Sequence, residues 1–273
     1  MPELPEAETV AKALRRVLPG RRISAVMVRA ERLRTSLKPL LDARLEGHVF
    51  TAVRRRGRYI VLALDDARGL LLHLGMTGAV SVVPADEPPR RHEHVILALD
   101  DASSFRFEDP RRFGVLECHP LRADGLPAAL DFLGPEPLTD AFDAEGLHRA
   151  AHQRRIAVKE LLMDNRVVTG VGNIYATESL FAAGIRPAHR SDRLGMAACA
   201  RLVAAVKEIL ARAIAAGGTT ISDFRGVDGS EGRFSRELLV YGKAGGACPC
   251  CGATLRTVKL GGRSSCYCPK CQS

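Results

Sequence analysis

The segment 248–271, CPCCGATLRTVKLGGRSSCYCPKC, decides the fold of the C-terminal part of this chain. It contains two Cys-x2-Cys pairs separated by sixteen residues: Cys248, Cys251, Cys268 and Cys271. This spacing is typical of a four-cysteine zinc ribbon, in which two short knuckles close on one tetrahedral ion. Cys250 and Cys266 are alternative ligands, but only the outer set gives both pairs a two-residue gap. We predict one structural zinc ion, which suits a plain binding module as well as an enzyme.

The composition is that of a globular chain with a packed core. A length of 273 residues is enough for one large domain or two ordinary ones. Hydrophobic residues make up 46% of the chain, which is enough to form a packed core. No apolar run approaches the length that spans a bilayer, and the N-terminus lacks the basic-then-apolar pattern of a signal peptide. We therefore expect a cytoplasmic location.

The net charge of +9 is unevenly distributed along the sequence. Residues 1–150 hold 22 Lys and Arg against 22 Asp and Glu, whereas residues 151–273 hold 18 against 9. A basic half favours a polyanionic partner, and nucleic acid is the first candidate. The alternative is a surface whose charge only keeps the protein soluble.

Hydrophobic periodicity divides the chain into a strand-rich part and a helical part. Residues 2–18 have apolar positions at helical spacing, and short strand-like runs separated by turns follow from about 22 to 119. Strands without intervening helices predict an antiparallel sandwich or barrel. The stretch 120–150 is rich in Pro and Gly and is the best candidate linker. Helical patterns follow at 156–164, at 173–183 and in a long segment that ends at Gly217-Gly218.

Several motifs stand in a fixed order along the sequence. The N-terminus reads Pro2-Glu-Leu-Pro-Glu6, and the zinc ribbon stands at the other end. Between them lie His73-Leu-Gly-Met-Thr-Gly78, Asp109-Pro-Arg-Arg-Phe-Gly114, Leu162-Met-Asp-Asn165, Gly170-Val-Gly-Asn-Ile-Tyr-Ala176 and Glu178-Ser-Leu-Phe-Ala-Ala-Gly184. Together these motifs resemble the formamidopyrimidine-DNA glycosylase family, also called 8-oxoguanine-DNA glycosylase, over essentially the whole chain.

The resemblance implies an α+β fold in three parts. These are an N-terminal antiparallel β-sandwich with flanking helices, a helical helix-two-turn-helix domain and a four-cysteine zinc finger. The corresponding boundaries are 2–130 for the catalytic sandwich, 131–150 for a linker, 151–235 for the DNA-binding helices and 236–273 for the zinc finger. Segment 219–236 resembles the family's loop over a flipped oxidised purine. The implied partner is damaged double-stranded DNA, bound by a monomer that associates with the nucleoid.

The resemblance also implies that the N-terminal amine attacks the DNA. Removal of Met1 exposes the secondary amine of Pro2, and a free α-amine titrates near pH 8, below lysine. The positive end of a helix starting there lowers that pKa further. Attack on C1′ of the deoxyribose expels the base and leaves an iminium, which promotes β- and then δ-elimination. Glu3 is expected to transfer protons, while Glu6 shapes the site. On local sequence alone, a helix start with a capping carboxylate is the alternative.

One position departs from the family pattern. The family has a lysine that assists catalysis in the segment that here reads Arg54-Arg-Arg-Gly57-Arg58-Tyr59. Arg58 keeps the positive charge, but a guanidinium does not readily exchange a proton. We therefore expect base excision to be slower, or the substrate range to differ.

The remaining site residues are assigned because they match positions in the family's motifs. Met76, Arg111 and Phe113 correspond to the residues that fill the space of a flipped base and contact the orphaned partner, with core packing as the alternative for Met76 and Phe113. For the DNA contact expected of Arg154, the neighbouring Gln153 is the alternative. Arg263 lies between the zinc knuckles and is grouped with the catalytic residues as a phosphate ligand. The other expected DNA contacts are His73, His92, Arg112, Arg154, Lys159, Asn173 and Tyr241.

Two other functions remain open at this point. An endonuclease VIII-like enzyme would favour oxidised pyrimidines, but that group has Gly where this chain has Leu4. A catalytically silent zinc-ribbon protein would bind DNA without cutting it. Pro2 and Glu3 argue against silence, whereas Arg58 argues slightly for it.

Overall fold

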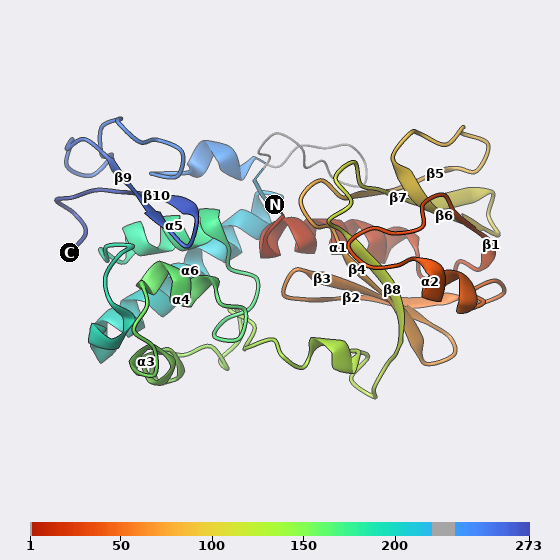
Figure 1. The fold of residues 1–273 in the computed structure, drawn as a ribbon, viewed down its shortest axis with the longest axis horizontal. Coiled ribbons are helices and arrows are strands. Elements are labelled where there is room, and N and C mark those ends of the chain that lie inside the picture. Colours follow the sequence, from red (N-terminus) through yellow and green to blue (C-terminus); the bar gives the residue numbers. More distant parts are fainter. Residues whose placement is uncertain (1, 220–232) are drawn as a thin grey trace. The chain divides into compact units, whose positions relative to one another are not determined.

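A computed structural model describes residues 2–219 and 233–273 of the chain. The fold divides into two compact units (Figure 1). Unit 1 comprises Met1–Asp131 and Gly217–Arg233, and unit 2 comprises Phe132–Ala216 and Phe234–Ser273. Two distant parts of the sequence therefore contribute to each unit.

Unit 1 is a sandwich of two four-stranded antiparallel sheets. One sheet has the order β1 (Ile23–Val28), β6 (Glu93–Leu99), β7 (Ser103–Glu108) and β5 (Ala79–Pro84). The other has the order β2 (Phe50–Arg56), β3 (Tyr59–Leu64), β4 (Arg68–His73) and β8 (Val115–Pro120). Side chains of both sheets share one apolar core, as expected for a sandwich. The antiparallel sandwich predicted from the strand pattern is confirmed.

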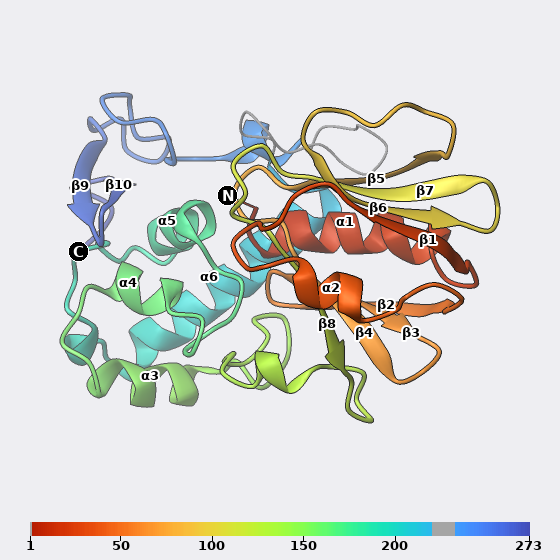
Figure 2. The same cartoon turned by 45° about the vertical axis from the view of Figure 1, so that its right-hand side comes forward.

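Helix α1 (Leu4–Val17) packs against β2 and β3 (Figure 2). It buries Val10, Ala11 and Leu14 in the sandwich core, which explains the helical spacing of its apolar residues. The unit also contains the short helix α2 (Lys38–Asp42) and the 3₁₀ turn η1 (Ala128–Leu130). The N-terminus of α1 is thus held by a rigid β framework.

Unit 2 is built from helices around a second apolar core. These are α3 (Ala144–His152), α4 (Val158–Met163), α5 (Asn173–Ala182) and α6 (Met196–Ala215), with 3₁₀ turns η2 (Ser191–Arg193) and η3 (Phe234–Glu237). Helix α3 occupies the end of the stretch expected to be a linker. Its start is capped by Asp143, whose carboxylate accepts from the Gly146 amide at 2.7 Å. The linker expectation therefore does not hold for the helical residues from Ala144 onward.

The end of unit 2 is an antiparallel hairpin. Strands β9 (Arg256–Leu260) and β10 (Arg263–Tyr267) are joined by Gly261 and Gly262, both at positive φ. A small core that includes Phe181 of α5 packs against this hairpin region. Within the described residues, no helix is long and apolar enough to cross a membrane.

Candidate functional site

The N-terminal motif forms the start of α1. Pro2 is buried and precedes Glu3, the N-cap residue. One carboxylate oxygen of Glu6 accepts from the Glu3 amide at 2.8 Å, and the other accepts from the Thr219 amide at 2.7 Å. Glu6 is therefore a capping carboxylate, and it also joins α1 to a segment 213 residues away. Gly218 is required beside it, because φ is +83° and a Cβ there would lie 2.9 Å from Glu6 Oε1.

Arg58 lies in the turn between β2 and β3 and is only 9% exposed. It lies close enough to His73 to act on its charge. Burial, followed by the positive charges of Arg58 and Arg34, lowers the pKa of His73 from 6.5 to about 4. His73 is therefore neutral at pH 7. Its Nδ1 accepts from the Gly75 amide at 3.0 Å, so Nε2 carries the proton and can donate to an anion.

The three residues matched to the base-filling role lie together on the surface of unit 1. Met76 is 37% exposed and Phe113 is 46% exposed, so the core-packing alternative is wrong for both. The Arg111 guanidinium lies over the Phe113 ring, 5.1 Å from its centroid. Met76 lies in loop 74–78, and the other two lie in loop 109–114.

Two predicted phosphate contacts lie on or beside loop 109–114. Arg112 is exposed and has a φ of 56°, an uncommon value for a residue with a side chain. The carbonyl of His92 accepts from the Asp109 amide at 3.0 Å. The backbone of unit 1 thus fixes the positions of both residues.

Unit 2 brings together three other predicted DNA contacts from three parts of the sequence. Lys159 Nζ donates to Asn173 Oδ1 at 2.6 Å, and Asn173 Nδ2 donates to the Tyr241 hydroxyl at 3.4 Å. Lys159 also donates to Ser265 Oγ at 2.7 Å and to the Ser264 carbonyl at 3.2 Å. Its three ammonium hydrogens thus have three acceptors within the protein, and only 1% of the residue is exposed. The structure therefore places Lys159 against Asn173, another predicted contact, and its own contact with DNA stays a prediction.

Sequence reasoning gave no role to Glu178, which holds Tyr241 in place. The buried carboxylate of Glu178 accepts from three successive backbone amides, at 2.7–3.0 Å; these belong to Leu239, Val240 and Tyr241. The signal for it was an acidic residue within an otherwise apolar helix. A buried carboxylate needs such donors, because an unpaired one is costly.

Two predicted residues of unit 2 lie on other elements. Arg154 follows α3 and is held by the Ala150 carbonyl at 3.0 Å and, more loosely, by Asp164 at 3.9 Å. Its neighbour Gln153, the alternative, is exposed. Arg263 is the exposed first residue of β10.

The four predicted zinc ligands converge on one point. Their Sγ atoms all lie within 4.8 Å of one another. The Cys248–Cys271 distance is 3.8 Å, and the Cys251–Cys268 distance is 3.5 Å. Tetrahedral coordination with Zn–S bonds of about 2.3 Å requires Sγ atoms about 3.8 Å apart. The arrangement fits zinc, and the prediction of one structural ion held by these four cysteines is confirmed.

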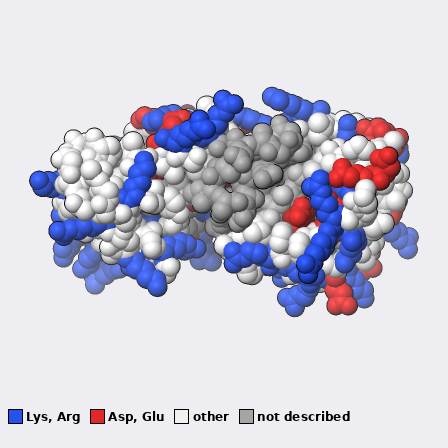
Figure 3. Space-filling view, turned by 90° about the horizontal axis from the view of Figure 1, so that it is seen from above, with Lys and Arg blue, Asp and Glu red and all other residues white. Residues whose placement is uncertain are grey.

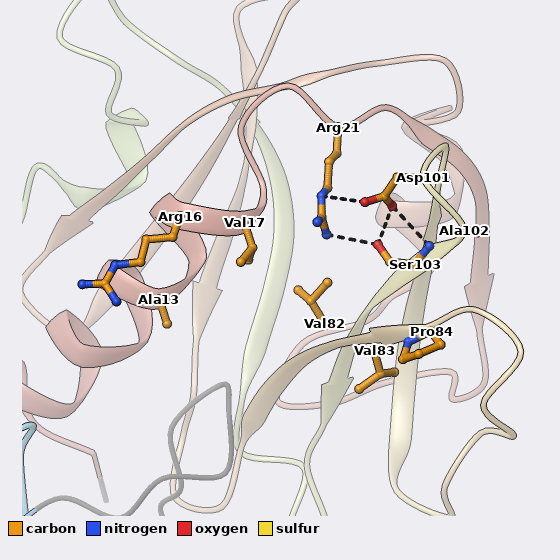
Figure 4. A pocket seen from close by; sticks show the side chains of 10 residues that line it. All are labelled: Ala13, Arg16, Val17, Arg21, Val82, Val83, Pro84, Asp101, Ala102 and Ser103. Carbon is orange, nitrogen blue, oxygen red and sulfur yellow. Dashed lines mark hydrogen bonds and ion pairs between the residues drawn. The ribbon is translucent and has the colours of Figure 1, made fainter.

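A cavity lies at the other end of α1 from Pro2. It measures about 550 Å³ and is lined by the last turns of α1, by β5 and by the turn before β7 (Figure 4). Within it, Arg21 is paired with Asp101 at 3.0 Å. None of its lining residues is a predicted site residue, so the candidate site is separate from it.

The surface charge follows the asymmetry of the sequence. On the face drawn in Figure 3, Lys and Arg predominate over unit 2, at the left, whereas both signs mix over unit 1, at the right. An excess of basic over acidic side chains favours an anionic partner.

Three family models match the chain in order. They are the formamidopyrimidine-DNA glycosylase N-terminal domain at residues 1–116, the H2TH domain of the same enzymes at 133–225, and a zinc finger found in FPG and IleRS at 245–273.

Full-length relatives and solved structures agree with these matches. Formamidopyrimidine-DNA glycosylases of Laribacter hongkongensis and Thioalkalivibrio sulfidiphilus are 48% and 46% identical, with all of both chains covered. The MutM (Fpg) protein of Thermus thermophilus superposes with a TM-score of 0.86 at 38% identity, covering 99% of this chain and 98% of that one. A Lactococcus lactis FPG mutant in complex with Fapy-dG-containing DNA gives 0.90 at 32% identity, with complete coverage of both.

Proposed function

The chain belongs to the formamidopyrimidine-DNA glycosylase family and is a DNA glycosylase of base excision repair, and on that premise we propose that Pro2 is its nucleophile. It binds damaged DNA. The proposed substrates are oxidised purines, namely 8-oxoguanine and formamidopyrimidines, and strand cleavage follows excision. The observation that carries the proposal is the placement of Pro2 directly before the capped start of α1, beside Glu3.

The proposed reaction begins with the amine of Pro2 after removal of Met1. The nitrogen lone pair forms a bond to C1′, and the C1′–base bond breaks with its electron pair leaving on the base. The nitrogen then loses its proton, which neutralises the departing base and frees the lone pair for ring opening. Ring opening, with a proton delivered to O4′ by Glu3, gives an iminium. This cation acidifies the C2′ hydrogens, so that loss of one proton expels the 3′ phosphate. A second elimination expels the 5′ phosphate, and water then releases Pro2.

Proposed DNA contacts are supported by the geometry of each unit taken separately. In unit 1, the neutral His73 offers Nε2–H to a phosphate, and the exposed Met76, Arg111 and Phe113 can enter a duplex. In unit 2, Lys159, Asn173 and Tyr241 are the proposed contacts, and hydrogen bonds join them. The remaining proposed contacts are His92, Arg112, Arg154 and Arg263.

The domain boundaries, the location and the oligomeric state are also part of the proposal. We take 2–130 as the catalytic sandwich, 151–235 as the DNA-binding helices and 236–273 as the zinc finger, with a linker whose end is helical. The proposed loop over a flipped base falls largely on residues 220–232, which lie outside the described residues. We further propose a cytoplasmic, nucleoid-associated monomer.

Borohydride trapping on a duplex containing 8-oxoguanine tests the nucleophile. We expect a covalent adduct whose DNA remnant maps to peptide 2–12 by mass spectrometry. Acetylation of the N-terminus is expected to abolish the adduct, because an amide nitrogen has no available lone pair. The matched control is binding to a duplex with an uncleavable abasic analogue, which the acetylated chain should keep within about threefold. An adduct on another residue, or none from the unmodified chain, contradicts the proposal.

A further inference from the structure

The two loops that carry the base-filling residues are both crossovers between the sheets of unit 1. Loop 74–78 connects β4 to β5, and loop 109–114 connects β7 to β8. Strand β4 pairs with β8 in one sheet, and β5 pairs with β7 in the other. At one end, the loops meet the paired residues His73 and Val115. At the other end, they meet the paired residues Ala79 and Glu108. The topology requires them to run side by side.

A single buried carboxylate joins these loops. Asp109 is 0% exposed. Its Oδ1 accepts from the Thr77 hydroxyl at 2.7 Å, and its Oδ2 accepts from the Gly114 amide at 2.7 Å. The Thr77 hydroxyl oxygen in turn accepts from the Arg111 amide at 3.2 Å. Asp109 thus fixes both ends of its own loop and the middle of the other.

The backbones of the two loops also touch directly. A Cβ on Gly75, where φ is +63°, would lie 2.5 Å from the Gly114 nitrogen and 2.6 Å from the Phe113 carbonyl oxygen. A Cβ on Gly114 would lie 2.9 Å from Asp109 Oδ2. A side chain at Gly75 would require loop 109–114 to move, and a side chain at Gly114 would displace the Asp109 carboxylate, so the two loops are packed tightly together.

We propose that Asp109 is a positioning residue that sets Met76, Arg111 and Phe113 in one geometry before DNA arrives. The proposal rests on the function proposed above for those three residues. Hydrogen bonds to a carboxylate are short and strong, and an unsatisfied buried carboxylate is costly, so the network resists rearrangement. Loops whose backbone is already fixed lose less conformational entropy when their side chains enter the duplex.

The role makes a specific demand on the reaction. Extruding a base from a duplex and contacting the cytosine left behind both require the three residues at fixed positions. An abasic site in single-stranded DNA has neither a base to extrude nor a partner to contact. Loss of the Asp109 network is therefore expected to impair lesion excision from duplex DNA and to spare Schiff-base formation on a single-stranded abasic site.

Thr77→Val is the leading test, because it keeps the shape of the side chain and removes the hydroxyl that bridges Asp109 and Arg111. Asp109→Asn is the second variant, since it turns one of two acceptors into a donor. We expect each to lower single-turnover excision of 8-oxoguanine opposite cytosine about tenfold, the effect of one hydrogen bond to a charged group. The preference for cytosine over adenine as the opposite base should fall with it. Thr77→Ser restores the hydroxyl and should restore both quantities.

Thr51→Val is the matched control, because Thr51 lies on β2 and its hydroxyl makes only a long bond to the Leu64 carbonyl. Borohydride trapping on a single-stranded abasic oligonucleotide should stay within about twofold in all variants. Wild-type excision and opposite-base preference in both Thr77→Val and Asp109→Asn would overturn the role, as would an equal loss on the single strand. A wild-type chain that forms no adduct refutes the proposed function itself, and the role of Asp109 falls with it.

Discussion

Arg58 occupies the position at which this chain departs from the lysine of its family. The side chain is almost buried, and its charge contributes to keeping His73 neutral. An ammonium would do the same, but it could also lose and regain a proton, which a guanidinium does not do near pH 7. We therefore expect residue 58 to keep a positioning role in this chain and to lose a proton-transfer role.

Arg58→Lys is expected to raise the rate of base excision. The gain should be about a hundredfold, at the low end of what a positioned acid or base contributes, and duplex affinity should change much less, since the charge is kept. Single-turnover excision of 8-oxoguanine measures the first quantity, and fluorescence anisotropy the second. Arg54→Lys, an exposed substitution of the same kind on β2, is the control. Equal rates for wild type and Arg58→Lys on every lesion tried would contradict the expectation.

The neutral His73 gives the fold a specific pH dependence. Because burial and Arg58 lower its pKa from 6.5 to about 4, the unfolded chain binds a proton between these values that the folded chain does not. Acidification from pH 6.5 towards pH 4 therefore favours unfolding, by about 2–3 kcal/mol from this residue alone, and its contribution is constant above pH 6.5. Urea denaturation should show a smaller loss for His73→Gln than for wild type over this range. His152→Gln, on an exposed histidine, should follow wild type; a His73→Gln curve parallel to wild type would refute the effect.

At the scale of elements, the zinc hairpin is the part that the sequence predicted best. Its four ligands come from two local motifs, and local spacing is visible without a structure. The sequence did not predict that the hairpin would hold Lys159, which in turn contacts Asn173. Lys159 reaches Asn173 at a separation of 14 residues, but it reaches Ser264 and Ser265 at separations of 105 and 106. Such contacts depend on how helices pack, which hydrophobic periodicity does not specify.

Loss of the zinc ion is expected to disturb the Lys159 network as well as the hairpin. Cys251→Ser removes one ligand, and a site of this kind contributes its binding energy directly to folding of the small domain around it. We expect less than one zinc per chain by metal analysis and a loss of duplex binding of about tenfold or more. Cys250→Ser is the matched control, because it removes an adjacent, exposed cysteine that is not a ligand. Full zinc content in Cys251→Ser, or its loss in Cys250→Ser, would contradict the ligand assignment.

For the whole molecule, the order of strand-rich and helical parts followed from the sequence, because alternation and helical spacing are distinct patterns. The division into units did not follow from the sequence. Unit 1 includes residues that come after α6, and no local sequence pattern connects them to it. Helix α3 was missed for a local reason. Residues 120–137 are rich in proline and glycine, and α3 buries only Leu147 and Ala151. Asp109 was visible within a motif, but its role depends on two crossovers that bring distant loops together.

The bond between Glu6 and Thr219 also has a consequence for synthesis on the ribosome. The Glu3 amide is available to Glu6 almost at once, whereas Thr219 is translated 213 residues later. At about 5–20 residues per second, that interval is about 10–40 s. During this time the emerging chain can pair its strands and pack α1, but it cannot close this link. The helix that presents the N-terminal amine is therefore fastened at its far-sequence anchor only when most of the polypeptide has been made.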